Sequence, residues 1–318
     1  MATISKLILT VKQMNVLDNF SKEFLTKAKL GFNYNCANDN INVVKWLYYL
    51  DKVDIHANND YAFTLCCNYG HLTVAKWLYS LGNIDIHDNN EEAFRWSCQD
   101  GQLAVAQWLY SLDNVDIHDQ NEYAFRCSCQ NGQLVVAQWL YSLGNVNIHT
   151  KNEYAFRWSC QNGHITVAKW LLGLGLGTTC SHPTCPPGTR YSLGNIDIHA
   201  NNEEAFRWSC QCGHLAVAQW LYSLGNVNIH TKNEYAFRWS CHYGHLAVAQ
   251  WLYSLGNVNI HDQNEYAFRW SCQGGHLAVA QWLYSLGNID IHANNDGAYP
   301  FSNEATKKWL NQIYSIKN

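Results

Sequence analysis

Charged residues are scarce in this sequence. Asp, Glu, Lys and Arg make up 14% of the 318 residues, whereas an average soluble protein has about 25%. The formal net charge is only −4, and no block of clustered Lys and Arg occurs. A surface that binds nucleic acid requires such clustering, so we expect no nucleic-acid partner.

Long hydrophobic runs are also missing. No apolar stretch approaches the roughly 18 residues of a transmembrane helix. The N-terminal segment MATISKLILTVKQ has too short an apolar core, and no small-residue cleavage pattern, for a secretory signal. The 13 cysteines are an odd number, which together with the missing signal predicts reduced thiols in an intracellular compartment. We therefore expect a protein without a membrane partner.

Repetition is what the sequence has in abundance. Asn264 to His292 reads NEYAFRWSCQGGHLAVAQWLYSLGNIDIH and differs from Asn233 to His261 at four positions. An Ile-His pair recurs every 31 residues, except for one step of 50 between His149 and His199. A period of 20 to 50 residues indicates a repeat array rather than one closed globular core.

Each copy predicts a short first helix. In the copy that begins at Asn264, this helix runs from about Glu265 to Gln273, and Gly275 ends it. Asn is a favoured N-cap because its side-chain oxygen accepts free backbone N–H groups. The acidic residue that follows suits the positive end of the helix dipole. We therefore place the start of the first helix at this pair in the later copies.

A second helix follows in each copy. His276 opens it, and apolar residues from Leu277 to Leu283 follow a helical spacing. Gly287 ends it, because glycine accepts the left-handed backbone common after a helix. Residues 288–295 contain Ile-Asp-Ile and are interpreted as the extended arm of a hairpin loop. The predicted fold is all-α, a solenoid of helix-turn-helix units with short hairpin loops.

The array has predicted ends and one insertion. Residues 1–28 lie outside the repeat and are expected to form an N-terminal helical cap, the 31-residue repeats span 29–295, and a truncated copy at 296–318 is expected to cap the C-terminus. The long step places an insertion at 176–194, after a complete second helix. It holds three of the four prolines and predicts an irregular loop past which the stacking continues.

These motifs resemble those of ankyrin-repeat proteins, most closely the divergent kind encoded by giant DNA viruses. YAFRWSC…GHLAVAQWLY…GNIDIH corresponds to the family pattern TPLHLAA…GHLEVVKLLL…GADVN. The sequence departs from the family in three ways: Arg replaces the His of TPLH, the hairpin is about three residues shorter, and the period is 31 rather than about 33. The resemblance implies L-shaped units whose first helices and loops line a concave groove.

Glu and Arg recur four residues apart on the predicted first helices. The pairs are Glu91/Arg95, Glu122/Arg126, Glu153/Arg157, Glu203/Arg207, Glu234/Arg238 and Glu265/Arg269. This spacing favours ion pairs of about 0.2 to 0.5 kcal/mol each, and a solvated or inter-repeat ladder of salt bridges is the simpler interpretation. The alternative is that the Arg row binds an acidic partner, because arginine offers carboxylates and phosphates a planar fork.

Tryptophan recurs in both predicted helices. The second-helix row, which includes Trp220 and Trp251, is explained by packing between copies. The first-helix row includes Trp158, Trp208 and Trp239, and some of these are candidates for partner contacts. Arg and aromatic side chains are the types enriched at binding hot spots.

Histidine and cysteine give no predicted metal or catalytic site. The two rows of His are interpreted as capping and turn groups, because His both donates and accepts hydrogen bonds, and Gln102 and Gln133 replace the second row in two copies. The periodic Cys row is interpreted as core, whereas Cys66, Cys127 and Cys212 fall outside it and could be exposed. The CSHPTC segment at 180–185 offers only three zinc-like ligands without the paired spacing of a structural site.

The sequence therefore predicts a non-enzymatic scaffold without cofactor or metal, monomeric, that binds another protein. The candidate contacts are Arg95, Arg126, Arg157, Arg207, Arg238 and Arg269 with Trp158, Trp208 and Trp239. The resemblance implies a viral protein that acts in the host cytoplasm on a host partner. The alternative is a structural, self-associating component, for example of a viral particle.

Overall fold

The described residues of the computed structural model, 31–51, 53–175 and 196–317, form α-helices joined by turns and loops. No strand occurs in these ranges, so the predicted all-α fold is confirmed. The predicted N-terminal cap at 1–28 and the insertion at 176–194 lie outside the described residues.

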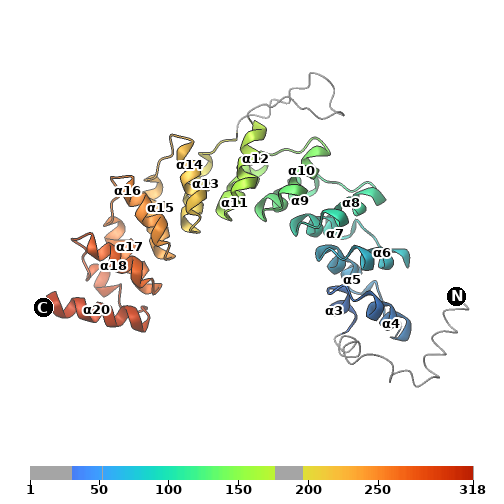
Figure 1. The fold of residues 1–318 in the computed structure, drawn as a ribbon, viewed down its shortest axis with the longest axis horizontal. Coiled ribbons are helices and arrows are strands. Elements are labelled where there is room, and N and C mark those ends of the chain that lie inside the picture. The colour runs from blue at the N-terminus through green and yellow to red at the C-terminus, as the bar shows by residue number, and fades with distance from the viewer. Residues whose placement is uncertain (1–30, 52, 176–195, 318) are drawn as a thin grey trace, which may run out of the picture. The chain divides into compact units, whose positions relative to one another are not determined.

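Helices alternate along the chain as a first and a second helix in each copy (Figure 1). The first helices are α3 (Phe32–Cys36), α5 (Ala57–Asn68), α7 (Asp88–Gln99), α9 (Asp119–Gln130), α11 (Thr150–Gln161), α13 (Ala200–Gln211), α15 (Thr231–His242) and α17 (Asp262–Gln273). The second helices are α4 (Ile41–Asp51), α6 (Leu72–Ser80), α8 (Leu103–Leu112), α10 (Leu134–Ser142), α12 (Ile165–Gly175), α14 (Leu215–Ser223), α16 (Leu246–Ser254) and α18 (Leu277–Ser285). Two further helices, α19 (Ala293–Asp296) and α20 (Glu304–Lys317), follow.

The chain divides into two compact units. Unit 1 comprises residues 1–128 and 133–147, and unit 2 comprises residues 129–132 and 148–318. Within unit 2, α11 packs on α13, α13 on α15 and α15 on α17, so first helices form one row and second helices another (Figure 1). The contact of α11 with α13 shows that stacking continues past the insertion between α12 and α13.

The core is built from the same positions of every copy. In α15 these are Ala236, Phe237 and Cys241, and in α16 they include Ala249 and Leu252, all at most 1% exposed. The apolar residues recur at three- and four-residue steps, which places them on the helix face that meets the neighbours. Fully burying a side chain such as Phe or Leu contributes about 1.5 to 3 kcal/mol.

The periodic cysteines belong to this core, as predicted. Burial raises the pKa of the Cys272 thiol to about 12, so such thiols stay protonated and unreactive. The expectation that Cys66 and Cys127 could be exposed is wrong, because they are 0% and 6% exposed. Cys66 Sγ lies 3.6 Å from the carbonyl oxygen of Cys36 in the preceding copy. Cys212 is half-buried.

The second-helix tryptophans join consecutive copies. The Trp251 ring lies edge-on to Tyr222 of the preceding copy at 5.8 Å between centroids, and at 6.2 Å from Phe206. Lys169 extends over Trp220 of the next copy, 5.8 Å from the ring centroid. Large aromatic area is buried at the boundary between copies, which confirms the packing role predicted for this row.

The histidines that open second helices also join copies. His71 Nε2 lies 2.9 Å from the carbonyl oxygen of Ala37 in the preceding copy. His214 and His245 make the equivalent backbone hydrogen bonds to Gln161 and Gln211. These carbonyls lie at the end of a first helix and have no partner within it. The interpretation of this row as capping groups is confirmed.

Gly213 leaves room for the ring of His245. Gly213 has φ +80°, and a Cβ atom there would lie 2.5 Å from His245 Nδ1. Gly225 has φ +96° but no atom within 4 Å of such a Cβ. We expect Gly213→Ala to lower the urea midpoint clearly more than Gly225→Ala, because both replacements strain the backbone but only the first displaces a histidine. Equal losses would contradict this packing account.

The capping histidines predict a pH dependence. Burial lowers the pKa of His214 and of His245 in the folded chain, and the unfolded value is about 6.5. The unfolded chain therefore binds more protons as the pH falls below about 6.5, and the stability that these residues contribute above that pH is lost. We expect the urea midpoint to fall less between pH 7.5 and 5 in a His214→Gln/His245→Gln variant than in the unchanged chain. An identical fall of the urea midpoint in both proteins would show that His214 and His245 do not cause the pH dependence.

Candidate functional site

The first helices begin with a left-handed turn. Lys232, Asn233 and Glu234 have φ values of 52°, 55° and 54°, and the right-handed helix starts only after them. The same three-residue turn occurs at 58–60, 89–91, 120–122, 151–153, 201–203, 263–265 and 294–296. This backbone costs roughly 1 to 2 kcal/mol per ordinary residue, and Asn tolerates it best. The predicted Asn N-cap is therefore wrong: Asn233 is the centre of a left-handed turn, and no side-chain cap bond forms.

The arginine of each first helix holds this turn. Arg238 Nε donates to the Asn233 carbonyl at 2.5 Å, and Nη2 donates to the Lys232 carbonyl at 3.1 Å. Arg95, Arg126, Arg157, Arg207 and Arg269 bond their own turns in the same way. The guanidinium fork thus binds two carbonyls that the left-handed backbone aims toward it.

The glutamate of the turn pairs with histidine rather than with arginine. His230 Nδ1 lies 2.8 Å from Glu234 Oε1, and the backbone N–H of Asn259, in the loop at the end of the same copy, donates to the same oxygen at 3.4 Å. In unit 1 the hydrogen bond to Glu91 raises the pKa of His87. The predicted i,i+4 ladder of Glu and Arg is therefore wrong. The pairing fails because the left-handed turn directs the Glu carboxylate to the adjacent loops and the Arg guanidinium to the backbone carbonyls of the turn.

The guanidinium groups also contact the next copy. Arg157 Nη1 pairs with Glu204, and Arg238 Nη1 donates to Gln263 Oε1 at 2.8 Å. Arg207 lies over the Tyr235 ring at 4.7 Å from its centroid. Burial lowers the pKa of Arg207, the same direction as for Arg269. The arginines therefore link each turn to the following first helix.

The structure separates the two kinds of predicted contact residue. Arg126, Arg157, Arg207, Arg238 and Arg269 are only 3–9% exposed, and Arg95 is half-buried. The predicted tryptophans Trp158, Trp208 and Trp239 are half-buried and keep part of their rings at the surface of the first helices. The arginines are thus committed to intramolecular bonds, whereas the tryptophans remain accessible.

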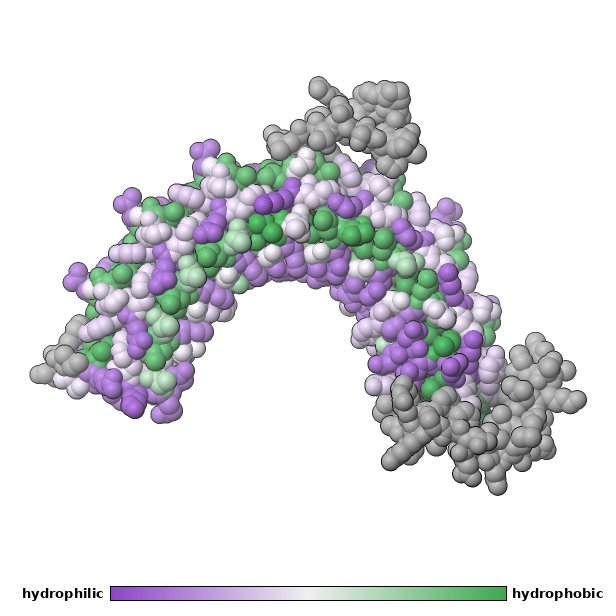
Figure 2. All heavy atoms as spheres, viewed as in Figure 1, coloured by the Kyte–Doolittle hydropathy of each residue, from purple (hydrophilic) through white to green (hydrophobic). Residues whose placement is uncertain are grey.

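An aromatic face runs along the first helices of unit 2. It consists of Tyr154, Trp158, Trp208, Tyr235, Trp239, His242, Tyr243, Tyr266 and Trp270. Trp158 and Trp208 meet edge-on at 5.4 Å, although 49 intervening residues include the insertion. Tyr243 is 45% exposed, and the other members are half-buried. Figure 2 shows hydrophilic and hydrophobic residues interspersed over the visible face of the described residues.

His242 completes the aromatic face. Its ring is stacked between Trp239, at 4.8 Å and 21°, and Trp270 of the next copy, at 4.7 Å and 14°. Burial and the nearby His276 lower the pKa of His242, which favours the uncharged ring. Gln211 and Gln273 occupy this position in neighbouring copies. The replacement of Gln by His at position 242 is evident from the sequence. The stacking of the His242 ring depends on Trp270 of the next copy, which sequence position alone does not place beside it.

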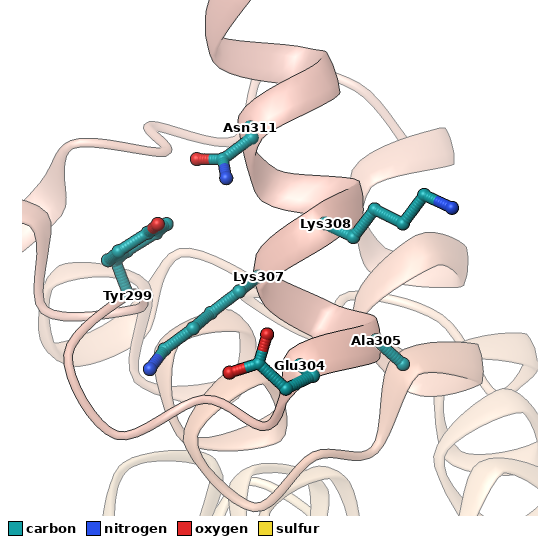
Figure 3. A pocket seen from close by; sticks show the side chains of 6 residues that line it. All are labelled: Tyr299, Glu304, Ala305, Lys307, Lys308 and Asn311. Atoms are coloured by element: carbon teal, nitrogen blue, oxygen red, sulfur yellow. The ribbon is translucent and has the colours of Figure 1, made fainter.

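Other features of the described chain give weaker candidates. A shallow depression of 600 Å³ beside α20 is lined by Tyr299, Glu304 and Lys307 among others. Figure 3 shows Glu304 and Lys307 on the side of Tyr299, with Lys308 directed away. Glu304 and Lys308 are exposed, and Lys307 lies over the Tyr299 ring, 5.9 Å from its centroid. Within the described ranges there is no set of three metal-ligating side chains, and no helix there has the length and apolarity to cross a membrane.

Comparison with known proteins identifies the repeat. A family model described as ankyrin repeats in three copies matches residues 32–121 and 206–296, together more than half of the chain. Among solved structures, the ankyrin repeat domain of human ASB11 is similar at 17% identity with a TM-score of 0.47, and the match covers 69% of this chain and 96% of that one. No curated protein matches the chain in sequence.

The turn-holding role of arginine predicts a stability loss. Replacing Arg238 with Lys removes the planar fork, so one of the two carbonyls loses its donor. A buried hydrogen bond to a charged group is worth about 1.5 to 3 kcal/mol, and we expect a loss of that size in urea unfolding. Lys232→Gln is the matched control, because only its backbone carbonyl is used. Equal stability of the two variants would contradict the role.

Proposed function

This chain belongs to the ankyrin-repeat family, and we propose that it is a non-enzymatic scaffold that binds a protein partner along its first helices. Ankyrin repeats generally mediate protein–protein interaction. The aromatic face of unit 2 is the observation that supports this proposal. Accessible Trp and Tyr offer large apolar area together with a polar group, which is why they are enriched at interfaces.

The two predicted residue rows have different proposed roles. Trp158, Trp208 and Trp239 are proposed to contact the partner directly. The arginines are proposed to contribute indirectly: they hold the left-handed turns and the register of adjacent helices, which positions the tryptophans. Arg95 differs from the others, because it is half-buried and leaves more of its side chain available for a partner.

A binding role also agrees with the chemistry of the described residues. The periodic thiols are buried and their pKa is raised by burial, which disfavours a cysteine nucleophile. The histidines cap carbonyls or pair with carboxylates. These groups are occupied by structural hydrogen bonds, whereas the aromatic face is accessible.

The biological setting is proposed from the resemblance to divergent viral repeats. On that basis the chain is a monomeric viral protein that acts in the host cytoplasm, and its partner is a host protein held on the concave side expected of ankyrin arrays. Residues 296–318, which contain α20, are proposed to close the array. A self-associating structural component is the competing proposal, and the following experiment separates the two.

Affinity capture from host cells, read by mass spectrometry, tests the proposal. We expect the unchanged chain to retain a partner that a Trp208→Ala/Trp239→Ala variant loses, because both changes remove accessible rings from the aromatic face. A Gln219→Ala/Gln250→Ala variant is the matched control on exposed positions of α14 and α16. Thermal melts establish that both variants are folded.

Three outcomes would count against the proposed function. If all three forms retain the same partner, binding does not use the aromatic face. If each form captures only further copies of itself, the self-associating alternative is supported instead. Loss of the partner from the Gln variant alone would move the interface to the second helices.

A further inference from the structure

Indole N–H groups are the first clue to the partner's chemistry. In unit 1 the N–H of Trp96 is already used, because its Nε1 donates to Glu92 Oε1 at 3.2 Å. In unit 2, Glu204 occupies the position of Glu92 but binds Arg157 and Asn201 instead. Over residues 148–175 and 196–317, the Nε1 atoms of Trp158, Trp208, Trp239 and Trp270 make no hydrogen bond within the chain. One face therefore presents a series of hydrogen-bond donors.

The polar groups between the tryptophans add further donors. Tyr154 and Tyr235 donate their hydroxyl hydrogens to Oε1 of Gln130 and Gln211, at 2.8 and 2.6 Å. Each glutamine oxygen is thereby occupied, whereas its NH₂ group remains a donor. The aromatic face thus offers flat apolar rings and N–H groups, and a matching partner must supply apolar surface and acceptors.

The charges of the face argue against a phosphate backbone. The guanidinium groups of Arg157, Arg207 and Arg238 are buried and bound to backbone carbonyls. Lys151 and Lys232 are exposed at the turns, but they do not form a continuous basic groove. Single-stranded nucleic acid stacks on aromatic rings but also requires such a groove. The face is therefore better suited to an uncharged segment.

A proline-rich segment in the polyproline II conformation has the matching chemistry. Its carbonyl groups have no internal hydrogen bonds, proline lacks an N–H, and such segments dock on aromatic surfaces with little loss of conformational entropy. Three residues make one turn of about 9 Å, which is close to the 8 to 10 Å between packed helices. Trp239 and Trp270 stack on opposite sides of His242, at 4.8 and 4.7 Å, so proline rings from two successive turns can each meet one of these indoles.

We propose that the aromatic face of unit 2 binds a proline-rich segment of another protein, extended across α11, α13, α15 and α17. This inference rests on the proposed function and names the class of partner. The proline rings lie against the exposed indole edges, and the indole N–H groups donate to the segment's carbonyls. His242 fills the space between Trp239 and Trp270 and keeps both indoles in position.

The test measures binding of a fluorescein-labelled (Pro-Pro-Ala)₅ peptide to the full chain by fluorescence anisotropy. The peptide is about 47 Å long at 3.1 Å per residue. We expect saturable binding, with no comparable binding of a (Gly-Ser-Ala)₅ peptide or of an oligothymidine. Trp208→Phe/Trp270→Phe keeps aromatic rings but removes two donors, and should weaken binding about 30-fold, since each of the two lost neutral hydrogen bonds contributes about 1 kcal/mol. Trp96→Phe is the control, because its N–H is already occupied.

Several results would overturn the inference. The inference is wrong if the proline peptide does not bind, or if the (Gly-Ser-Ala)₅ peptide binds equally well. It is also wrong if the chain prefers oligothymidine, or if Trp96→Phe weakens peptide binding as much as the double variant does. Capture of a host partner that depends on Trp208 and Trp239, without binding of the proline peptide, would retain the proposed function and reject this partner class. Failure of both experiments would reject both.

Discussion

Burial between consecutive copies is the constraint on which this structure depends. A single pair of helices cannot enclose residues such as Phe237 and Leu252, and each copy completes the core of its neighbour. The same boundary carries the aromatic contact of Tyr222 with Trp251 and the hydrogen bond from His245 to a carbonyl of the preceding copy. Stability is therefore distributed along the array, and each boundary contributes through the same few interactions.

The left-handed turn converts this repetitive packing into a defined surface. Its backbone is costly for ordinary residues, and Arg238 stabilises it by bonding two carbonyls while lying against Tyr266 of the next copy. The buried Glu234 joins the same turn to the following loop. Because the Arg and Glu side chains are bound to other groups of the chain, the accessible part of the first helices is aromatic and amide-rich instead of charged.

Small differences between copies determine where that surface is continuous. Trp occupies the first-helix position in α11, α13, α15 and α17, whereas α9 has Cys127 there. His242 extends the stacking from Trp239 to Trp270 in place of a glutamine. The buried Cys127 interrupts the row of first-helix tryptophans, and His242 extends the row of stacked rings.

The 31-residue period and the spacing of apolar residues alone determined the helix-turn-helix units, their core positions, and the glycines that end each helix. The turn at Asn233 and the bonding of Arg238 required the tertiary structure. The i,i+4 prediction holds only for a continuous right-handed helix, in which Glu and Arg four residues apart face each other. The left-handed turn directs the Glu and Arg side chains to different partners. Stacking of His242 likewise depends on a ring 28 residues away, which only packing between copies brings into contact.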